Sequence, residues 1–86
     1  MKVLFFSAAW CGACHGARPM VANVCKSMGV EMVDVYVDTE PGEHEAITRG
    51  VCGLPTIIVL DDDGHETARN EGAVSQSILI GLIKGE

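Results

Sequence analysis

Short apolar runs and segments of helical spacing alternate along the chain. The runs at residues 2–6, 30–37 and 55–60 predict three strands, because they are short, rich in β-branched or aromatic residues and bounded by turn-forming residues. The run at 55–60, PTIIVL, is almost wholly apolar, so we expect this strand in the centre of a sheet. The sequence DDDG at 61–64 is typical of a turn, and residues 65–71 behind it predict a fourth strand at the sheet edge.

Three helices are predicted in the remaining segments. The first has apolar residues at three- and four-residue steps and contains Pro19, where we expect a kink. Its apolar positions are Ala17, Val21, Val24 and Met28, and Gly29 is the expected stop. The second covers residues 39–50, with Gly50 at its end, and the third covers 75–84. Ser75 is the expected N-cap of the third, and its expected inner face is Ile78, Leu79, Leu82 and Ile83.

The element order is therefore strand, helix, strand, helix, strand, strand, helix. A helix between the first two strands implies a right-handed crossover and parallel pairing, whereas the short link at 61–64 implies an antiparallel hairpin. The order predicts an α/β fold, written βαβαββα, in which a four-stranded mixed sheet has helices on both faces. We expect residues 1–86 to form one domain.

Composition and charge narrow the classes of partner. Hydrophobic residues make up 48% of the 86 residues and the formal net charge is -6, without a cluster of Lys and Arg. Nucleic acids and anionic membranes are therefore poor partners. The apolar run at the N-terminus, about five residues, is short for a signal peptide. The run ILIGLI at 78–83 is far too short to span a bilayer. We expect a cytoplasmic protein without a cofactor, in a compartment where thiols are mostly reduced.

Cys11 and Cys14, in the string WCGACHG, carry the candidate chemistry. With His15 they match the attachment signal for c-type haem, but the chain has strong strand signals and no export signal. A zinc or iron–sulfur site needs further ligands, and the other cysteines, Cys25 and Cys52, stand alone in the sequence. A reversible dithiol agrees best with the context, because the pair follows a strand and opens a helix.

The two cysteines have different expected roles in a dithiol. Unpaired backbone N–H groups and the positive end of the helix dipole favour a thiolate at the helix start. Cys11 is therefore the expected nucleophile. Cys14 lies one turn into the helix, is expected to be more buried, and is suited to attack a mixed disulfide at Cys11.

Several separate segments together resemble the thioredoxin family. The string WCGACHGARP, the later GLPTIIVLDDDG and then EGAVS match it in order, and the similarity covers about residues 3–84. The resemblance implies a thioredoxin-like fold, in a minimal version of glutaredoxin size, and a cis peptide between Leu54 and Pro55. It also implies a substrate groove around the cysteines, lined by Trp10, Gly12, Ala13, Gly53, Leu54, Pro55, Gly72 and Ala73.

The function implied by the resemblance is reduction of protein disulfides through Cys11 and Cys14. The expected partners are disulfide-containing proteins and an electron donor, either a reductase like thioredoxin reductase or glutathione, and we expect a monomer. A glutathione-dependent glutaredoxin is the alternative within this class: the short chain favours it, whereas Trp10 and the pair Gly72–Ala73 argue against it. A metal or Fe–S module that uses the two cysteines is the alternative from another class.

Two departures from the thioredoxin pattern affect the chemistry. Ala13 stands where the family has proline, and we expect a somewhat less reducing couple. Phe5 stands where the family keeps a buried aspartate, and Asp34 stands at the matching position of the next strand, which is often lysine. One hypothesis is that the acid has moved to the neighbouring strand and that a buried Asp34 accepts the Cys14 proton. The alternative is an exposed aspartate on a polar strand face.

Overall fold

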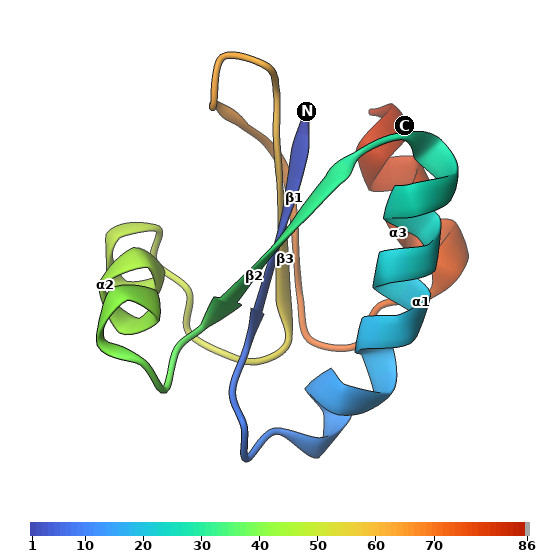
Figure 1. The fold of residues 1–86 in the computed structure, drawn as a ribbon. Coiled ribbons are helices and arrows are strands. Elements are labelled where there is room, and N and C mark those ends of the chain that lie inside the picture. Colours follow the sequence, from blue (N-terminus) through green and yellow to red (C-terminus); the bar gives the residue numbers. More distant parts are fainter. Residues whose placement is uncertain (86) are drawn as a thin grey trace.

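The computed structural model describes residues 1–85 as four strands and three helices (Figure 1). Their bounds in chain order are β1 Lys2–Ser7, α1 Gly12–Met28, β2 Glu31–Tyr36, α2 Glu40–Thr48, β3 Thr56–Leu60, β4 Glu66–Glu71 and α3 Gln76–Lys84. Each predicted element is present, and most boundaries differ from the prediction by one or two residues. None of these helices is long and apolar enough to cross a membrane.

The strands form one mixed sheet in the order β2-β1-β3-β4. β1 pairs with β2 in parallel, as the crossover through α1 requires, and pairs with β3 antiparallel. The hairpin of β3 and β4 is antiparallel, so β4 is an edge strand and β3 is central, as predicted. α1 and α3 cover one face of the sheet and α2 covers the other (Figure 1).

Strand alternation divides the core into two layers. Along β1, Val3 and Phe5 point to the layer under α1 and α3, whereas Leu4 and Phe6 point to the layer under α2. All four are buried, because β1 lies inside the sheet with helices on both faces. The strand before the cysteines is therefore held from both sides, and its end is a fixed point for the segment that follows.

Helix α3 docks with most of the predicted face, including Leu82, and differs from the prediction at one position. Leu79 and Ile83 are buried against the sheet as expected, and Ser75 Oγ accepts from the backbone N–H of Ile78 at 3.2 Å, which confirms the N-cap. Ile78, however, is exposed, and Ile80 packs against the core in its place. The prediction for Ile78 is wrong because this short helix meets the sheet along a narrow stripe.

Single residues explain the bend of α1, the position where it ends and the position where α2 begins. α1 is continuous through Pro19, and Figure 1 shows its first turns running at an angle to the remainder. Gly29 ends the helix in the left-handed conformation, with φ 69°. α2 begins where Thr39 Oγ1 accepts from the backbone N–H of Gly42 at 3.2 Å, a typical N-cap. These caps fix where each helix leaves the sheet.

Candidate active site at the start of the first helix

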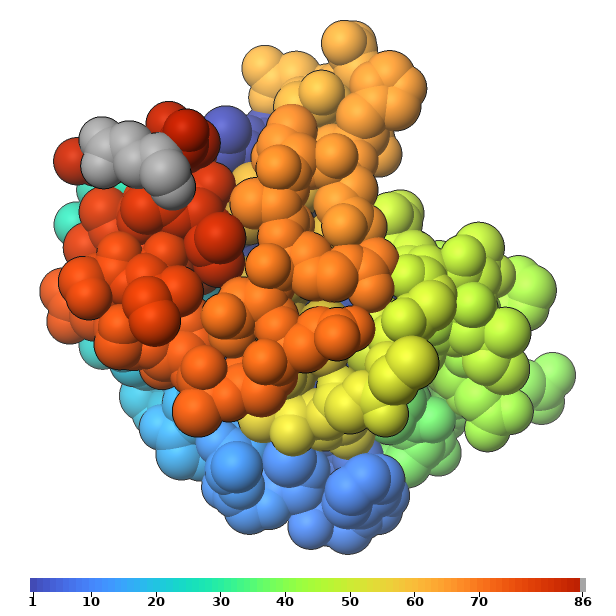
Figure 2. All heavy atoms as spheres, turned by 180° about the vertical axis from the view of Figure 1, so that it is seen from behind, coloured from blue at the N-terminus to red at the C-terminus, as the bar shows by residue number. Residues whose placement is uncertain are grey.

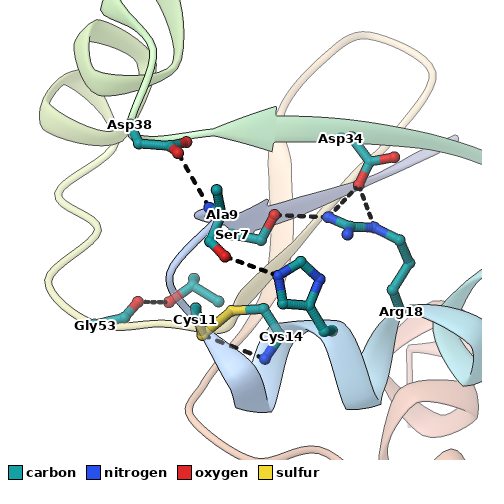
Figure 3. Close-up of a disulfide and its surroundings, with 10 residues drawn as sticks. Ser7, Ala9, Cys11, Cys14, Arg18, Asp34, Asp38 and Gly53 are labelled. Carbon is teal, nitrogen blue, oxygen red and sulfur yellow. Dashed lines mark hydrogen bonds and ion pairs between the residues drawn. A yellow bond between two sulfur atoms is a disulfide. The ribbon is translucent and has the colours of Figure 1, made fainter.

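Cys11 and Cys14 form a disulfide at the start of α1 (Figure 3). Their Cα atoms are 5.3 Å apart, a normal separation for bonded cysteines. Cys11 is the N-cap residue and has extended backbone angles, and the backbone N–H of Cys14 donates to Cys11 Sγ at 3.2 Å. The helix start thus directs a backbone donor at the first sulfur.

The two sulfurs differ in accessibility in the order the sequence predicts. The Cys11 residue keeps 8% of its surface exposed, whereas Cys14 is fully buried in the core. In the reduced protein, the helix N-terminus and the Cys14 N–H would stabilise negative charge on Cys11. A partner can therefore reach only Cys11, and Cys14 is placed to attack from behind it.

The segment before β3 lies against the cysteine pair. The Leu54–Pro55 peptide is cis, as the resemblance implied. The carbonyl of Pro55 accepts from the backbone N–H of Gly72 at 2.8 Å, and Thr56 Oγ1 donates to the carbonyl of Gly53 at 2.6 Å. Figure 2 shows the surface of this segment, in yellow, meeting the blue start of α1. These bonds hold the segment in place beside the disulfide.

A cavity of about 270 Å³ opens beside Cys11. Its lining residues are Trp10, Cys11, Val37, Ala46, Val51, Cys52, Gly53 and Leu54. Trp10 is 73% exposed and forms part of the rim. The cavity is mainly apolar, so it can accept a hydrophobic side chain next to the reactive sulfur.

The cavity includes some of the predicted groove residues and omits others. Trp10, Gly53 and Leu54 line it, and Pro55 adjoins it through the chain. The predicted residues outside its lining are Gly12, Ala13, Gly72 and Ala73. Sequence reasoning missed Val37, Ala46 and Val51. The apolar end of the predicted second strand was a usable signal for Val37, but nothing local indicates that α2 contributes Ala46.

Asp34 lies on the strand position that the sequence comparison indicated, but it is not buried. The sheet register pairs Phe5 with Asp34, and Phe5 is fully buried. The Asp34 side chain is 37% exposed and its Oδ1 atom lies 3.0 Å from Arg18 Nη2. Of the two alternatives, the buried carboxyl is therefore wrong and the exposed aspartate is confirmed: the Asp34 carboxylate contacts both the Arg18 guanidinium and solvent.

Arg18 is the polar residue near the cysteines that sequence reasoning missed. Besides its ion pair with Asp34, it donates from Nη2 to Ser7 Oγ at 2.7 Å. Its guanidinium carbon lies 5.2 Å from the centre of the Phe5 ring and 5.1 Å from that of Tyr36. Its place four residues after Cys14, one helical turn on, was the only signal in the sequence.

The segment between β1 and α1 is tied down by side chains. His15 Nε2 donates to the carbonyl of Ala9 at 2.9 Å, and the backbone N–H of Ala9 donates to Asp38 Oδ2 at 3.1 Å (Figure 3). His15 is exposed, as expected. Its role here is to close the turn that presents Trp10 and Cys11.

Among the described residues, no third metal-ligating side chain is grouped with the cysteine pair. Within residues 1–85, the one group of three such residues is Asp61, Asp63 and His65 in the β3–β4 turn. It contains no cysteine and is largely exposed. The cysteine pair itself is bonded as a disulfide, the oxidised form of a dithiol.

The two remaining cysteines differ in a way that a thiol titration will show. Cys52 is exposed, whereas Cys25 is buried in the core and burial raises the pKa of its thiol. We expect Ellman's reagent to modify one thiol of the native oxidised protein quickly and a second only after denaturation. Cys52→Ser should remove the fast reaction. Two fast thiols in the native protein would contradict this assignment.

Comparisons with known proteins agree with the fold and the site. The family model described as Thioredoxin matches residues 1–85. A probable thioredoxin of Archaeoglobus fulgidus is 31% identical over 80 residues, which are 93% of this chain and 86% of the relative. Thioredoxin 2 of Plasmodium falciparum is 37% identical over 82 residues, 95% of this chain and 52% of the relative. The chain spans 55% of the matched thioredoxin of Bacillus subtilis and 46% of the chloroplastic M-type thioredoxin of maize.

Solved structures show the same likeness. Thioredoxin 1 of Thermosipho africanus superposes with a TM-score of 0.87 at 25% identity, over 98% of this chain and 91% of the other. The structure of thioredoxin-2, described as a component of the malaria parasite protein secretion machinery, superposes with a TM-score of 0.85 at 34% identity. The superposition covers 99% of this chain and 82% of the other. The family model covers all of the described residues, and these include the Cys11–Cys14 disulfide. The chain therefore belongs to the thioredoxin family.

Proposed function

We propose that this protein is a thiol–disulfide oxidoreductase that reduces disulfides of protein substrates through Cys11 and Cys14. The observation that carries the proposal is the arrangement of the pair. Cys11, the more exposed of the two at 8%, begins the helix beside an apolar cavity, and the fully buried Cys14 is bonded to it. Family membership supports the same activity. The pair requires no cofactor for this chemistry, because the two sulfurs themselves carry the electrons.

The proposed reaction has two exchange steps. The Cys11 thiolate attacks one sulfur of the substrate disulfide, forms a mixed disulfide and releases the other substrate sulfur as a thiolate. The Cys14 thiolate then attacks Cys11 Sγ, breaks the mixed disulfide and releases the second substrate thiolate. The substrate gains two electrons and the protein is left as the Cys11–Cys14 disulfide, which is the state in the structure.

The groove residues support binding of an extended substrate segment. Its backbone would lie along Leu54, as an added strand does, and one apolar side chain would enter the cavity beside Trp10. The predicted contacts at Gly12, Ala13, Gly72 and Ala73 would lie outside this cavity. This arrangement recognises chain conformation and an apolar residue near the disulfide, so it suits several protein substrates.

The proposed electron donor is a flavoprotein reductase of the thioredoxin reductase type, with glutathione as the alternative. The match to thioredoxins rather than the size of the chain supports the reductase. We propose that the protein acts as a monomer in the cytoplasm, where the exposed Cys52 thiol would remain reduced.

Reduction of a disulfide-bonded protein such as insulin tests this function. We expect catalytic amounts of the protein to accelerate reduction by dithiothreitol, and to couple NADPH oxidation to insulin in the presence of thioredoxin reductase. Glutathione with glutathione reductase should support the reaction poorly. Turnover with glutathione alone would identify a glutaredoxin, and no acceleration with any donor would contradict the proposed function.

A further inference from the structure

A charged network lies where this chain departs from the thioredoxin pattern. The resemblance implies an acid on the first strand, at Phe5, and often a lysine at Asp34. Here the acid is on β2 and the cation comes from α1, because Asp34 pairs with Arg18 (Figure 3). Relative to that pattern, the acid lies on the second strand instead of the first, and the cation lies on the helix that carries the cysteines instead of on the second strand.

Arg18 is held firmly for a surface cation. Its guanidinium donates to Ser7 Oγ, pairs with Asp34 and lies against the Phe5 and Tyr36 rings. Its side chain is 24% exposed. Because three different kinds of contact fix the group, its charge has a defined position next to the end of β1.

The helix places this cation near Cys14. Residues four apart on an α-helix are neighbours, with Cβ atoms about 6 Å apart, so Arg18 follows Cys14 on the same helix face. Phe5, on which the guanidinium rests, belongs to the same core cluster as Cys14. In Figure 3 the guanidinium lies beside the Asp34 carboxylate and the Ser7 side chain. In partly buried surroundings, a cation on the same helix face stabilises an anion more than it would in water.

We infer that Arg18 is a positioning residue whose charge stabilises the Cys14 thiolate during the second exchange step, and that Asp34 weakens this effect. The inference rests on the proposed function, since Cys14 must lose its proton before it attacks Cys11 Sγ. With Phe5 in place of an acid, that proton passes to solvent and no buried carboxylate takes it. The Cys14–Cys11 bond then forms as the bond from Cys11 to the partner sulfur breaks.

Other charged or titratable groups face this region from each element around it. They are His15 and the buried thiol of Cys25 on α1, Asp34 and Tyr36 on β2, and Asp38 after β2. In α3 the one charged residue is Lys84, at the C-terminal end of the helix. His15 and Asp38 are hydrogen-bonded to Ala9 in the turn before α1. Arg18 and Asp34 are therefore the charged pair to which we assign the effect on Cys14.

The second exchange step can be followed with Ellman's reagent in a Cys52→Ser background. Attack by Cys11 releases one equivalent of thionitrobenzoate, and attack of Cys14 on the resulting mixed disulfide releases a second. We expect Arg18→Gln to raise the pH midpoint of the second release by about 0.5–1 unit, which slows it about three- to tenfold near neutral pH. Asp34→Asn should lower the midpoint and accelerate the step.

The two variants are expected to shift the pH midpoint in opposite directions, and this distinguishes the inference from a role of Asp34 as the base. If Asp34 accepted the Cys14 proton, Asp34→Asn would slow the second release, and that result would overturn the inference. Equal midpoints for the parent and Arg18→Gln would overturn it as well. Asp34 is exposed, so its variant tests the inference even if loss of Arg18 disturbs folding.

Two further variants control for structural effects. Arg49 resembles Arg18 in exposure, at 27%, and pairs with Glu45 at 2.6 Å in α2, so Arg49→Gln should leave the midpoint unchanged. Arg18→Lys keeps the charge and should restore most of the parent rate. A parent protein that never releases the second equivalent would refute the proposed function itself, whereas a normal second release that ignores Arg18 refutes only the inference.

Discussion

Cys11→Ser will abolish reduction of protein disulfides, with a loss of several orders of magnitude in rate. A serine hydroxyl is not ionised near neutral pH and cannot form the mixed disulfide, and no other thiol replaces Cys11 at the helix start. Cys14 is fully buried and cannot meet a protein substrate in its place. Insulin reduction with dithiothreitol measures the loss against the uncatalysed rate.

Cys14→Ser should behave differently, because its defect lies in the second step. Cys11 will still attack the substrate, and the mixed disulfide will accumulate as a covalent complex visible on a non-reducing gel. Cys25→Ala is the matched control: it removes a buried cysteine of the same helix outside the disulfide and should keep activity. A stable complex formed by Cys11→Ser, or full activity of either active-site variant, would refute the assigned roles.

The elements of this fold are predictable because the apolar spacing and the capping residues agree. The run PTIIVL became a fully buried central strand, and Ser75 caps the last helix as its type and place suggested. The strand order is a different matter. The crossover helix predicts that β1 pairs with β2, but nothing in the run at 2–6 shows that β3 flanks β1 on its other side.

The candidate site likewise has one part that the sequence predicts and another that only the structure shows. Cys11 and Cys14 are identifiable because their chemistry depends on a local helix start. The contact between Arg18 and Asp34 joins residues 16 apart in sequence on different elements, so only the packing of α1 on β2 reveals it. The same contact explains why Asp34 is not a buried acid: its strand lies at the sheet edge, where an arginine from the helix and solvent both reach it.

The cavity beside Cys11 depends on helix α2 as much as on α1. Val37 follows β2 and Ala46 belongs to α2, so the turn between these elements determines the wall opposite Trp10. That turn is compact: both the backbone N–H and Oγ1 of Thr39 donate to the carbonyl of Tyr36, at 3.1 and 2.7 Å. The structure of the cavity therefore depends on how closely α2 can approach the end of β2.

Gly42→Ala should be the most destabilising single-methyl change in this turn, at about 3 kcal/mol of the free energy of unfolding. A Cβ atom at residue 42 would lie 1.7 Å from the carbonyl oxygen of Tyr36, a backbone atom that no rotamer change can move away. The first turn of α2 must shift, which breaks the Thr39 cap and opens the cavity wall. Denaturant unfolding followed by circular dichroism measures the loss.

Gly16→Ala is the matched control, because it makes the same chemical change inside a helix. A Cβ atom at residue 16 would meet no atom within 4 Å, and alanine favours the helix over glycine, so this variant should gain about 0.5–1 kcal/mol. The two variants should thus move stability in opposite directions. If Gly42→Ala were as stable as the parent, the close approach of α2 to Tyr36 would not exist in solution, and the wall of the cavity beside Cys11 would have a different shape.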